Sequence, residues 1–334
     1  DGQVPPGRYL LMAHSRERGE SELVPVKVVA GQTVRANLLL PAPGEVEFRV
    51  TDQGGLAIPC RVSFQRLDAD GNLLPWDGSN QPELGDSRYD FGVTREAFSV
   101  DGTGTQAMAP GRYRVTASRG FEDGVARQDV EVRPGQSLPL RLSILHEVDT
   151  PDHISADFHV HAGRSTDSSL PMSLRARTAA TEGVEFFVAS DHDEVVDYQP
   201  YILEEALQQF FNFEMGCEVS PLEYGHYNGF PLEFDGRINF MNNPPRWPGL
   251  TIYQLFEEIR SKADGPEDAF VLQANHPRDG FMGYFSQTGM KGYDLSRKTP
   301  GMEMCNQVME ESPCDFQGME IMNGKNLQYL HTPT

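Results

Sequence analysis

A duplicated segment near the start of the chain constrains its fold more than any other sequence feature. The Pro-Gly-Arg-Tyr motif at 6–9 recurs at 110–113, and the Gly-Gln pair at 31–32 recurs at 135–136. Both pairs of motifs lie 104 positions apart, with no gap between them. A fixed offset held over roughly 35 residues is typical of duplicated structural modules.

The repeated region shows the alternation that is typical of β-strands. Val46, Phe48 and Val50, for example, alternate with charged residues. Period-2 alternation broken by Gly and Pro turns predicts half-buried antiparallel strands. We therefore predict a β-sandwich over residues 42–147. Residues 1–41 are predicted to form the C-terminal half of an equivalent first module, so that the chain begins inside a domain.

The two copies of the module resemble the carboxypeptidase regulatory-like β-sandwich. The resemblance covers residues 1–146 and rests on the repeated turns and on the strand pattern between them. It implies a spacer or docking role without chemistry. Because such modules accompany exported proteins, it also implies a periplasmic or extracellular location.

Charge and composition exclude several partner classes. The chain has 28 Lys and Arg against 49 Asp and Glu, which gives a net charge of −21. This balance disfavours nucleic acid and anionic membrane surfaces, since both attract a basic face. The apolar runs are too short to span a bilayer. The four cysteines are too few for a disulfide scaffold, although Cys305 and Cys314 could pair in an oxidising compartment.

The sequence changes character after residue 146. Eight of the nine histidines lie from His146 onward. Short apolar runs there alternate with helix-like segments at 173–181, 199–210 and 251–262, the last capped by Thr251. Alternating strands and helices predict an α/β domain over 148–334, with a parallel sheet or a (β/α) barrel.

Polar side chains follow the predicted strands of this second domain. Because strand ends share one face of a (β/α) barrel, these side chains are expected to converge. Histidine, aspartate and glutamate are suitable ligands for divalent metals, and two histidines at i and i+2 point to the same side of a strand. The side chains concerned are His159, His161, Asp191, His192, Glu218, Asn275, His276, Arg278, Glu320 and Asn323.

Six spaced blocks of this domain resemble a known superfamily in their order. They read ADFHVHAGRSTDS, VASDHDEVVDY, GCEVSP, GHYNGFPL, QANHPR and MEIMNG. The series resembles the PHP (polymerase and histidinol phosphatase) superfamily, and the fourth and fifth blocks are similar to its carbaryl-hydrolase-like branch. The resemblance implies a distorted (β/α)7 barrel with two or three divalent metal ions, zinc, manganese or iron, at its C-terminal mouth.

The resemblance also implies a role for individual residues. His159 and His161 would bind a first metal, which Glu218 would bridge to a second. His226 and His276 would complete the second site, and Asp167 and His192 would bind a third ion. Asp191 would orient a ligand imidazole. Asn275, Arg278 and Asn323 would line the pocket, where Arg278 would hold an anionic group or stabilise a developing oxyanion.

One part of the superfamily pattern is missing from this chain. An Asp-x-His block is expected after the Asn-Gly stretch, and no such block precedes Thr334. We therefore expect a PHP domain that is truncated at its C-terminus, with an incomplete barrel.

Three functional hypotheses follow from these residues. The first is a metal-dependent hydrolase that activates water against a small-molecule phosphoester or a carbamate, ester or amide. The second is a non-catalytic surface or glycan-binding protein with a degenerate barrel. The third, proteolytic or redox chemistry at Cys217, is disfavoured because Cys217 and its neighbour Glu218 point to opposite faces of a strand.

Overall fold

The chain divides into two compact units. The computed structural model describes residues 4–15, 17–74, 95–236, 243–287 and 315–321. The first unit comprises Asp1–Asp152 together with Ala180–Gly183, and the second comprises His153–Ala179 together with Val184–Thr334. Within the described ranges, no helix is long and apolar enough to cross a membrane.

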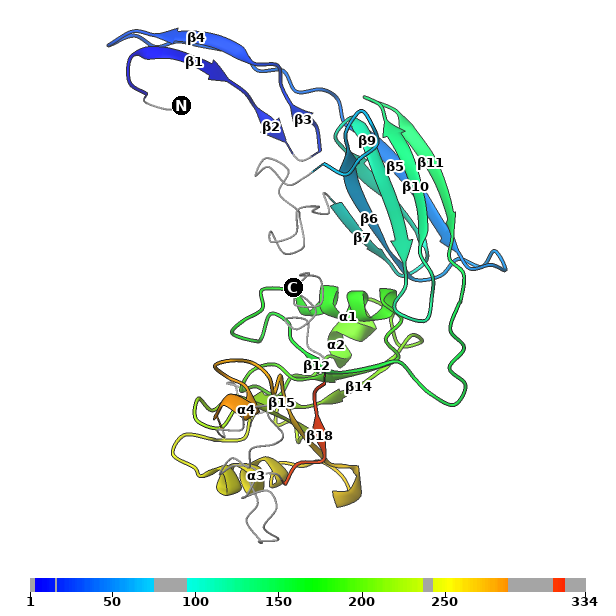
Figure 1. Cartoon of the computed structure of the whole chain (residues 1–334), viewed down its shortest axis with the longest axis vertical. Helices are drawn as coiled ribbons and strands as arrows, with labels where there is room; N and C mark the ends of the chain where they lie inside the picture. The colour runs from blue at the N-terminus through cyan, green and yellow to red at the C-terminus, as the bar shows by residue number, and fades with distance from the viewer. Residues whose placement is uncertain (1–3, 16, 75–94, 237–242, 288–314, 322–334) are drawn as a thin grey trace, which may run out of the picture. The chain divides into compact units, whose positions relative to one another are not determined.

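The larger part of the first unit is a β-sandwich of two sheets (Figure 1). One sheet has the strand order β10-β9-β6-β7, and the other has the order β11-β5-β8. The strands are β5 (Gly44–Thr51), β6 (Cys60–Leu67), β7 (Arg95–Ser99), β8 (Thr103–Met108), β9 (Gly111–Ser118), β10 (Ala126–Val132) and β11 (Ser137–Ser143).

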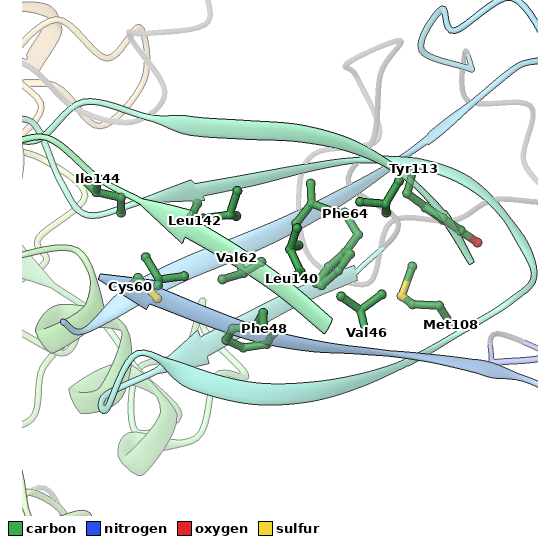
Figure 2. Close-up of a cluster of buried hydrophobic side chains, with 14 of the residues drawn as sticks. Val46, Phe48, Cys60, Val62, Phe64, Met108, Tyr113, Leu140, Leu142 and Ile144 are labelled. Carbon is green, nitrogen blue, oxygen red and sulfur yellow. The ribbon is translucent and has the colours of Figure 1, made fainter. Parts of the chain in front are cut away.

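The two sheets enclose one hydrophobic core between them (Figure 2). Val46, Phe48 and Val50 of β5 point into this core, while the charged residues between them are exposed. Phe64 of β6 and Leu140 of β11 lie in the same cluster. The period-2 pattern of the sequence is therefore the pattern of burial in the sandwich.

One strand pair differs from the antiparallel pairing expected from the sequence. β11 runs parallel to β5, with Leu140 opposite Phe48, whereas the other pairs of the sandwich are antiparallel. Side chains alternate between the two faces of a strand in either arrangement. The hydrophobic pattern therefore cannot distinguish parallel from antiparallel pairing.

The first copy of the repeat forms a hairpin whose outer strand pair has the register of the second copy. Its strands are β1 (Gly7–Leu11), β2 (His14–Ser15), β3 (Gly19–Glu20) and β4 (Val24–Val28). Gly7 pairs with Val28 in the first copy, as Gly111 pairs with Val132 in the second. The offset of 104 therefore holds for the strand register as well as for the sequence. In the described structure, residues 33–39, the counterpart of β11, form no strand.

The same offset relates two tyrosine hydrogen bonds. The hydroxyl of Tyr113 donates to the carbonyl oxygen of Ala109 at 2.9 Å, and the hydroxyl of Tyr9 donates to that of Pro5 at 2.7 Å. Tyr113 is buried, whereas the Tyr9 hydrogen bond is exposed. Each bond fixes the turn that precedes a strand, and only the buried one is protected from water.

These two tyrosines allow a matched test of stability. We expect Tyr113→Phe to lower the free energy of unfolding by about 1 kcal/mol, because it leaves a buried carbonyl without its donor. Tyr9→Phe should change the free energy of unfolding by at most about a few tenths of a kcal/mol, since water replaces an exposed hydrogen bond. Urea denaturation of both variants measures the difference. An equal or larger loss in Tyr9→Phe would contradict this account of the repeat.

The second unit contains short strands and short helices. Its strands are β12 (Ala156–Val160), β13 (Phe186–Ala189), β14 (Asn212–Met215), β15 (Cys217–Val219), β16 (Tyr227–Phe230), β17 (Val271–Ala274) and β18 (Gly318–Met319). Its helices are α1 (Met172–Thr181), α2 (Gln199–Glu204), α3 (Ile252–Arg260), α4 (Tyr284–Gln287) and the 3-10 helix η1 (Glu267–Ala269). As the sequence predicts, the side chain of Thr251 caps α3.

The strands of the second unit form two small sheets. β12, β13 and β14 are parallel, in the order β12-β13-β14. The second sheet has the order β15-β16-β17-β18 and is mixed, because β16 is antiparallel to both of its neighbours. A parallel bridge between His192 and Glu218 connects the loop after β13 to β15.

The predicted distorted (β/α)7 barrel is wrong for the described part of the chain. Strands predominate there, the four α-helices are short, and β15, β16 and β17 do not alternate with helices as a barrel requires. Only Gly216 separates β14 from β15, and a short loop joins β15 to β16. The prediction failed because short apolar runs show that strands exist but not which way they run.

Candidate metal centre

Several strands bring polar side chains to one edge of the second unit. His159 lies in β12, and His161 follows its last residue, Val160. The loop after β13 lies beside the carboxyl end of β12, since Ser190 Oγ accepts a hydrogen bond of 2.8 Å from the Val160 N–H. His192 follows in that loop. The parallel strands β12 and β13 therefore bring three imidazoles together at their carboxyl ends.

The mixed sheet supplies the remaining imidazoles. His276 follows the carboxyl end of β17, and His226 precedes the first residue of β16. Because β16 is antiparallel to β17, its amino end lies at the edge where β17 ends. Glu218 lies in the middle of β15, and all three residues of that strand are buried.

Glu218 is the centre of this arrangement. Its Oε2 atom lies 3.3 Å from His159 Nε2, 3.0 Å from His161 Nε2 and 3.1 Å from His192 Nδ1. Its side chain is only 1% exposed. Three imidazoles from two different strand ends thus surround one carboxylate oxygen.

The second oxygen of the same carboxylate has a different set of neighbours. Glu218 Oε1 lies 3.2 Å from His226 Nδ1 and 3.0 Å from His276 Nε2. It also accepts a hydrogen bond of 2.9 Å from Asn275 Nδ2. The carboxylate therefore lies between two groups of imidazoles.

A second carboxylate lies at the outer side of the cluster. Asp167 Oδ1 is 3.0 Å from His161 Nδ1, and Asp167 Oδ2 is 3.6 Å from His192 Nε2. Among the residues that the structure describes, three overlapping groups place their ligand atoms within 4.8 Å of one another. They are His159, His161 and Glu218; His161, Asp167 and His192; and His192, Glu218 and His226.

Several ligand atoms of the cluster have no hydrogen-bond partner among the described residues. The buried atoms concerned are His161 Nε2, Glu218 Oε2, His226 Nε2 and His276 Nδ1. His161 Nε2 and Glu218 Oε2 lie 3.0 Å apart without hydrogen-bond geometry. Two ligands bound to one ion at about 2.0–2.2 Å lie about 2.9–3.5 Å apart. The spacing therefore fits lone pairs directed at a common ion.

The buried charges shift the pKa values of these groups. Burial alone would raise the pKa of Glu218, but His159 and the other imidazoles hold it well below its usual range. Burial would lower the pKa of His159, yet the carboxylates of Glu218 and Glu320 raise it to about 10. His192 has a lowered pKa because burial dominates there.

Two predicted site residues support the cluster and do not line the pocket. Asn275 is fully buried and donates to Glu218 and, at 2.7 Å, to Asn228 Oδ1. Asp191 is also fully buried, and its Oδ1 accepts from the Ala162 N–H at 2.8 Å. Asp191 was expected to orient an imidazole, but its hydrogen bond goes to the backbone next to His161.

The pocket beside the cluster has one basic residue that the sequence did not indicate. The cavity has a volume of about 410 Å³. Arg175 of α1 lines it, and its Nε donates to the His161 carbonyl oxygen at 2.8 Å. Arg278, the expected pocket cation, is exposed and does not line this cavity. Arg175 was not predicted because the candidate side chains were those that follow strands, whereas Arg175 lies in α1. Asn323 lies outside the described residues.

The cysteines give no sign of chemistry at this site. Burial raises the pKa of the Cys217 thiol well above its usual range, and the side chain packs in the hydrophobic cluster beside α3. A neutral buried thiol is a poor nucleophile. Cys60 and Cys217 are free, and Cys305 and Cys314, which could pair in an oxidising compartment, lie outside the described residues.

Comparisons with known proteins return only distant similarity. No family model and no curated protein matches the chain. A streptococcal ancillary pilin is 14% identical, over 43% of this chain and 46% of that one, with a TM-score of 0.25. A DUF3823 family protein from Parabacteroides merdae is 17% identical, over 34% and 52%, with a TM-score of 0.22. A minor pilin of Streptococcus agalactiae is 16% identical, over 46% and 66%, with a TM-score of 0.22. The chain thus spans about half the length of the first two.

These findings correct the predicted family. The matching solved structures named above are pilins and a DUF3823 protein, and no family model matches the chain. The described strands also do not form the expected barrel. Assignment to the PHP superfamily and its carbaryl-hydrolase-like branch is therefore wrong, because the described part of the chain lacks the barrel that this assignment implies.

The predicted hydrolase activity is corrected with the family. No family model or curated protein supports an enzyme, and the described strands do not form the barrel that the hydrolase prediction required. The prediction of hydrolase activity failed because histidines and carboxylates at strand ends indicate only a set of metal ligands. The same set occurs on different folds and with different functions.

Proposed function

We propose that this chain is a non-catalytic surface protein whose second unit binds divalent metal ions at the Glu218 cluster. The β-sandwich acts as a spacer or docking module outside the cell, a common use of this architecture. The observation that carries the proposal is the convergence of five imidazoles on the two oxygens of one buried carboxylate.

The chemistry of the ligands supports zinc, manganese or iron. Imidazole nitrogen and carboxylate oxygen are borderline to hard ligands, and these metals bind them well. Glu218 belongs to two of the three ligand groups, and so can bridge neighbouring ions. Two or three ions are compatible with groups that overlap in this way.

A metal-free cluster would be unstable by comparison. Ring centroids lie 4.8 Å apart for His159 and His161, and 4.9 Å apart for His226 and His276. Protonated imidazoles at these distances repel, and the Glu218 carboxylate is shared by five of them, with Asp167 and Glu320 in contact with two and one of them. Neutral imidazoles would instead leave buried nitrogens without partners, at about 1–3 kcal/mol each. A bound cation removes both costs.

A metal titration tests the proposal directly. Chelator-treated protein should show a higher melting temperature for its second unit when Zn²⁺ or Mn²⁺ is added. An ion at 100 times its Kd stabilises by about 2.7 kcal/mol. Glu223→Gln, which removes an exposed carboxylate from the loop between β15 and β16, should behave like the unaltered protein. If Zn²⁺, Mn²⁺ and Fe²⁺ all leave the melting temperature unchanged, the proposal fails.

A further inference from the structure

Glu320 connects two imidazoles of the cluster that come from different strands. It follows β18, and its N–H donates to the Ala274 carbonyl oxygen at 2.9 Å. β18 pairs with β17, with Ala274 opposite Met319. The carboxyl end of β18 is therefore fixed beside the end of β17, next to His276.

The first contact of Glu320 is with His159. Glu320 Oε1 lies 3.3 Å from His159 Nδ1, while His159 Nε2 lies 3.3 Å from Glu218 Oε2. An ionised carboxylate only accepts hydrogen bonds, so the contact places a proton on Nδ1. When an ion displaces the proton on the opposite nitrogen, the lone pair of the imidazole is on Nε2, which faces the cluster.

The second contact of Glu320 is with the backbone of His276. Glu320 Oε2 accepts a short hydrogen bond from the His276 N–H. The backbone of His276 has a φ of +26°, in a region that residues other than glycine rarely adopt. Such a conformation is strained and persists only when surrounding contacts hold it. Glu320 is one of these contacts.

We infer that Glu320 is a positioning residue of the metal centre, which holds His159 in its ligating tautomer and His276 in its ligating conformation. The inference rests on the proposed function, since it concerns the same cluster. Glu320 itself belongs to none of the three ligand groups and does not line the cavity. Its effect on the ions passes through the two histidines.

Glutamine separates this role from simple packing. It has nearly the same shape as glutamate, so a packing role predicts that Glu320→Gln changes nothing. Its single carbonyl oxygen can accept from His159 or from His276, but its amide nitrogen then faces the other donor. The positioning role therefore predicts a loss of metal affinity in Glu320→Gln and a greater loss in Glu320→Ala.

The experiment measures zinc affinity by competition with a chromophoric chelator. We expect Glu320→Gln to bind zinc about 10–100-fold more weakly, the usual effect of losing a partner of a ligand. Glu223→Gln is the matched control, with one carboxylate removed from an exposed loop. An unfolding transition measured for each metal-free variant establishes that its second unit is folded before metal is added.

A second readout reports on His159 itself. In zinc-loaded protein labelled with ¹⁵N-histidine, a hydrogen-bonded Nδ1 proton should give a protected low-field resonance that disappears in His159→Gln. The same resonance should be lost or strongly shifted in Glu320→Gln. Equal zinc affinity and an unchanged resonance in that variant would overturn the inference. Failure of the unaltered protein to bind any of zinc, manganese and iron would instead overturn the proposed function.

Discussion

Replacing Glu218 with glutamine should lower the zinc affinity of the second unit by at least about 100-fold. Glu218 supplies an oxygen to two of the three ligand groups, and both of its oxygens contact imidazoles. Loss of an indirect partner of a ligand already costs about 10–100-fold. Loss of a shared anionic ligand should cost more, because it also removes the charge that balances the ions.

The substitution is designed to leave the surroundings intact. Glutamine keeps the size of the side chain, and its carbonyl oxygen can still accept from Asn275 Nδ2. Zinc affinity is measured by chelator competition beside the exposed control Glu223→Gln. If Glu218→Gln and the control bound zinc equally well, Glu218 would not be the centre of a metal site.

Metal affinity should also rise steeply with pH through the neutral range. In the absence of metal, Glu218 and Glu320 raise the pKa of His159 to about 10, although burial opposes this. The pKa of His161 is raised as well, against the effect of burial. His159 therefore holds a proton at pH 7, which an incoming ion must displace, and the raised pKa of His161 acts in the same direction. Each displaced proton makes affinity fall about tenfold per pH unit below these pKa values.

His192 and Asp167 should release no proton when the ion binds. The pKa of His192 is lowered by burial, and that of Asp167 is lowered to about 2, against burial, by Ser165 and His161. Calorimetric titration of zinc in two buffers with different ionisation enthalpies counts the protons released. An affinity independent of pH between about 6 and 9, with no proton release, would contradict the charge arrangement described here.

The sandwich could be predicted from the sequence because its signal is local. Alternation in β5 and the fixed offset of 104 specify which side chains are buried and which turns are equivalent. Strand direction was not predictable in the same way, as the parallel pairing of β11 with β5 shows. Direction depends on how the chain returns to the sheet, and side-chain alternation does not record it.

The second unit shows the same limit more strongly. His159, His161, His192, Glu218 and His276 could be proposed as neighbours because they lie in or just after short apolar runs. The fold around them could not be inferred, since β16 runs antiparallel to its neighbours. Arg175 and the buried supporting role of Asn275 depend on contacts between distant segments, which no local pattern contains.

The central claim is that the Glu218 cluster holds divalent metal ions. Metal content by plasma mass spectrometry, on protein purified without chelator and after supplementation with zinc, manganese or iron, tests it most directly. The account predicts about two or three equivalents per chain, in keeping with the three overlapping ligand groups, and a clear loss in Glu218→Gln. Less than a tenth of an equivalent in the unaltered protein under every condition would contradict it.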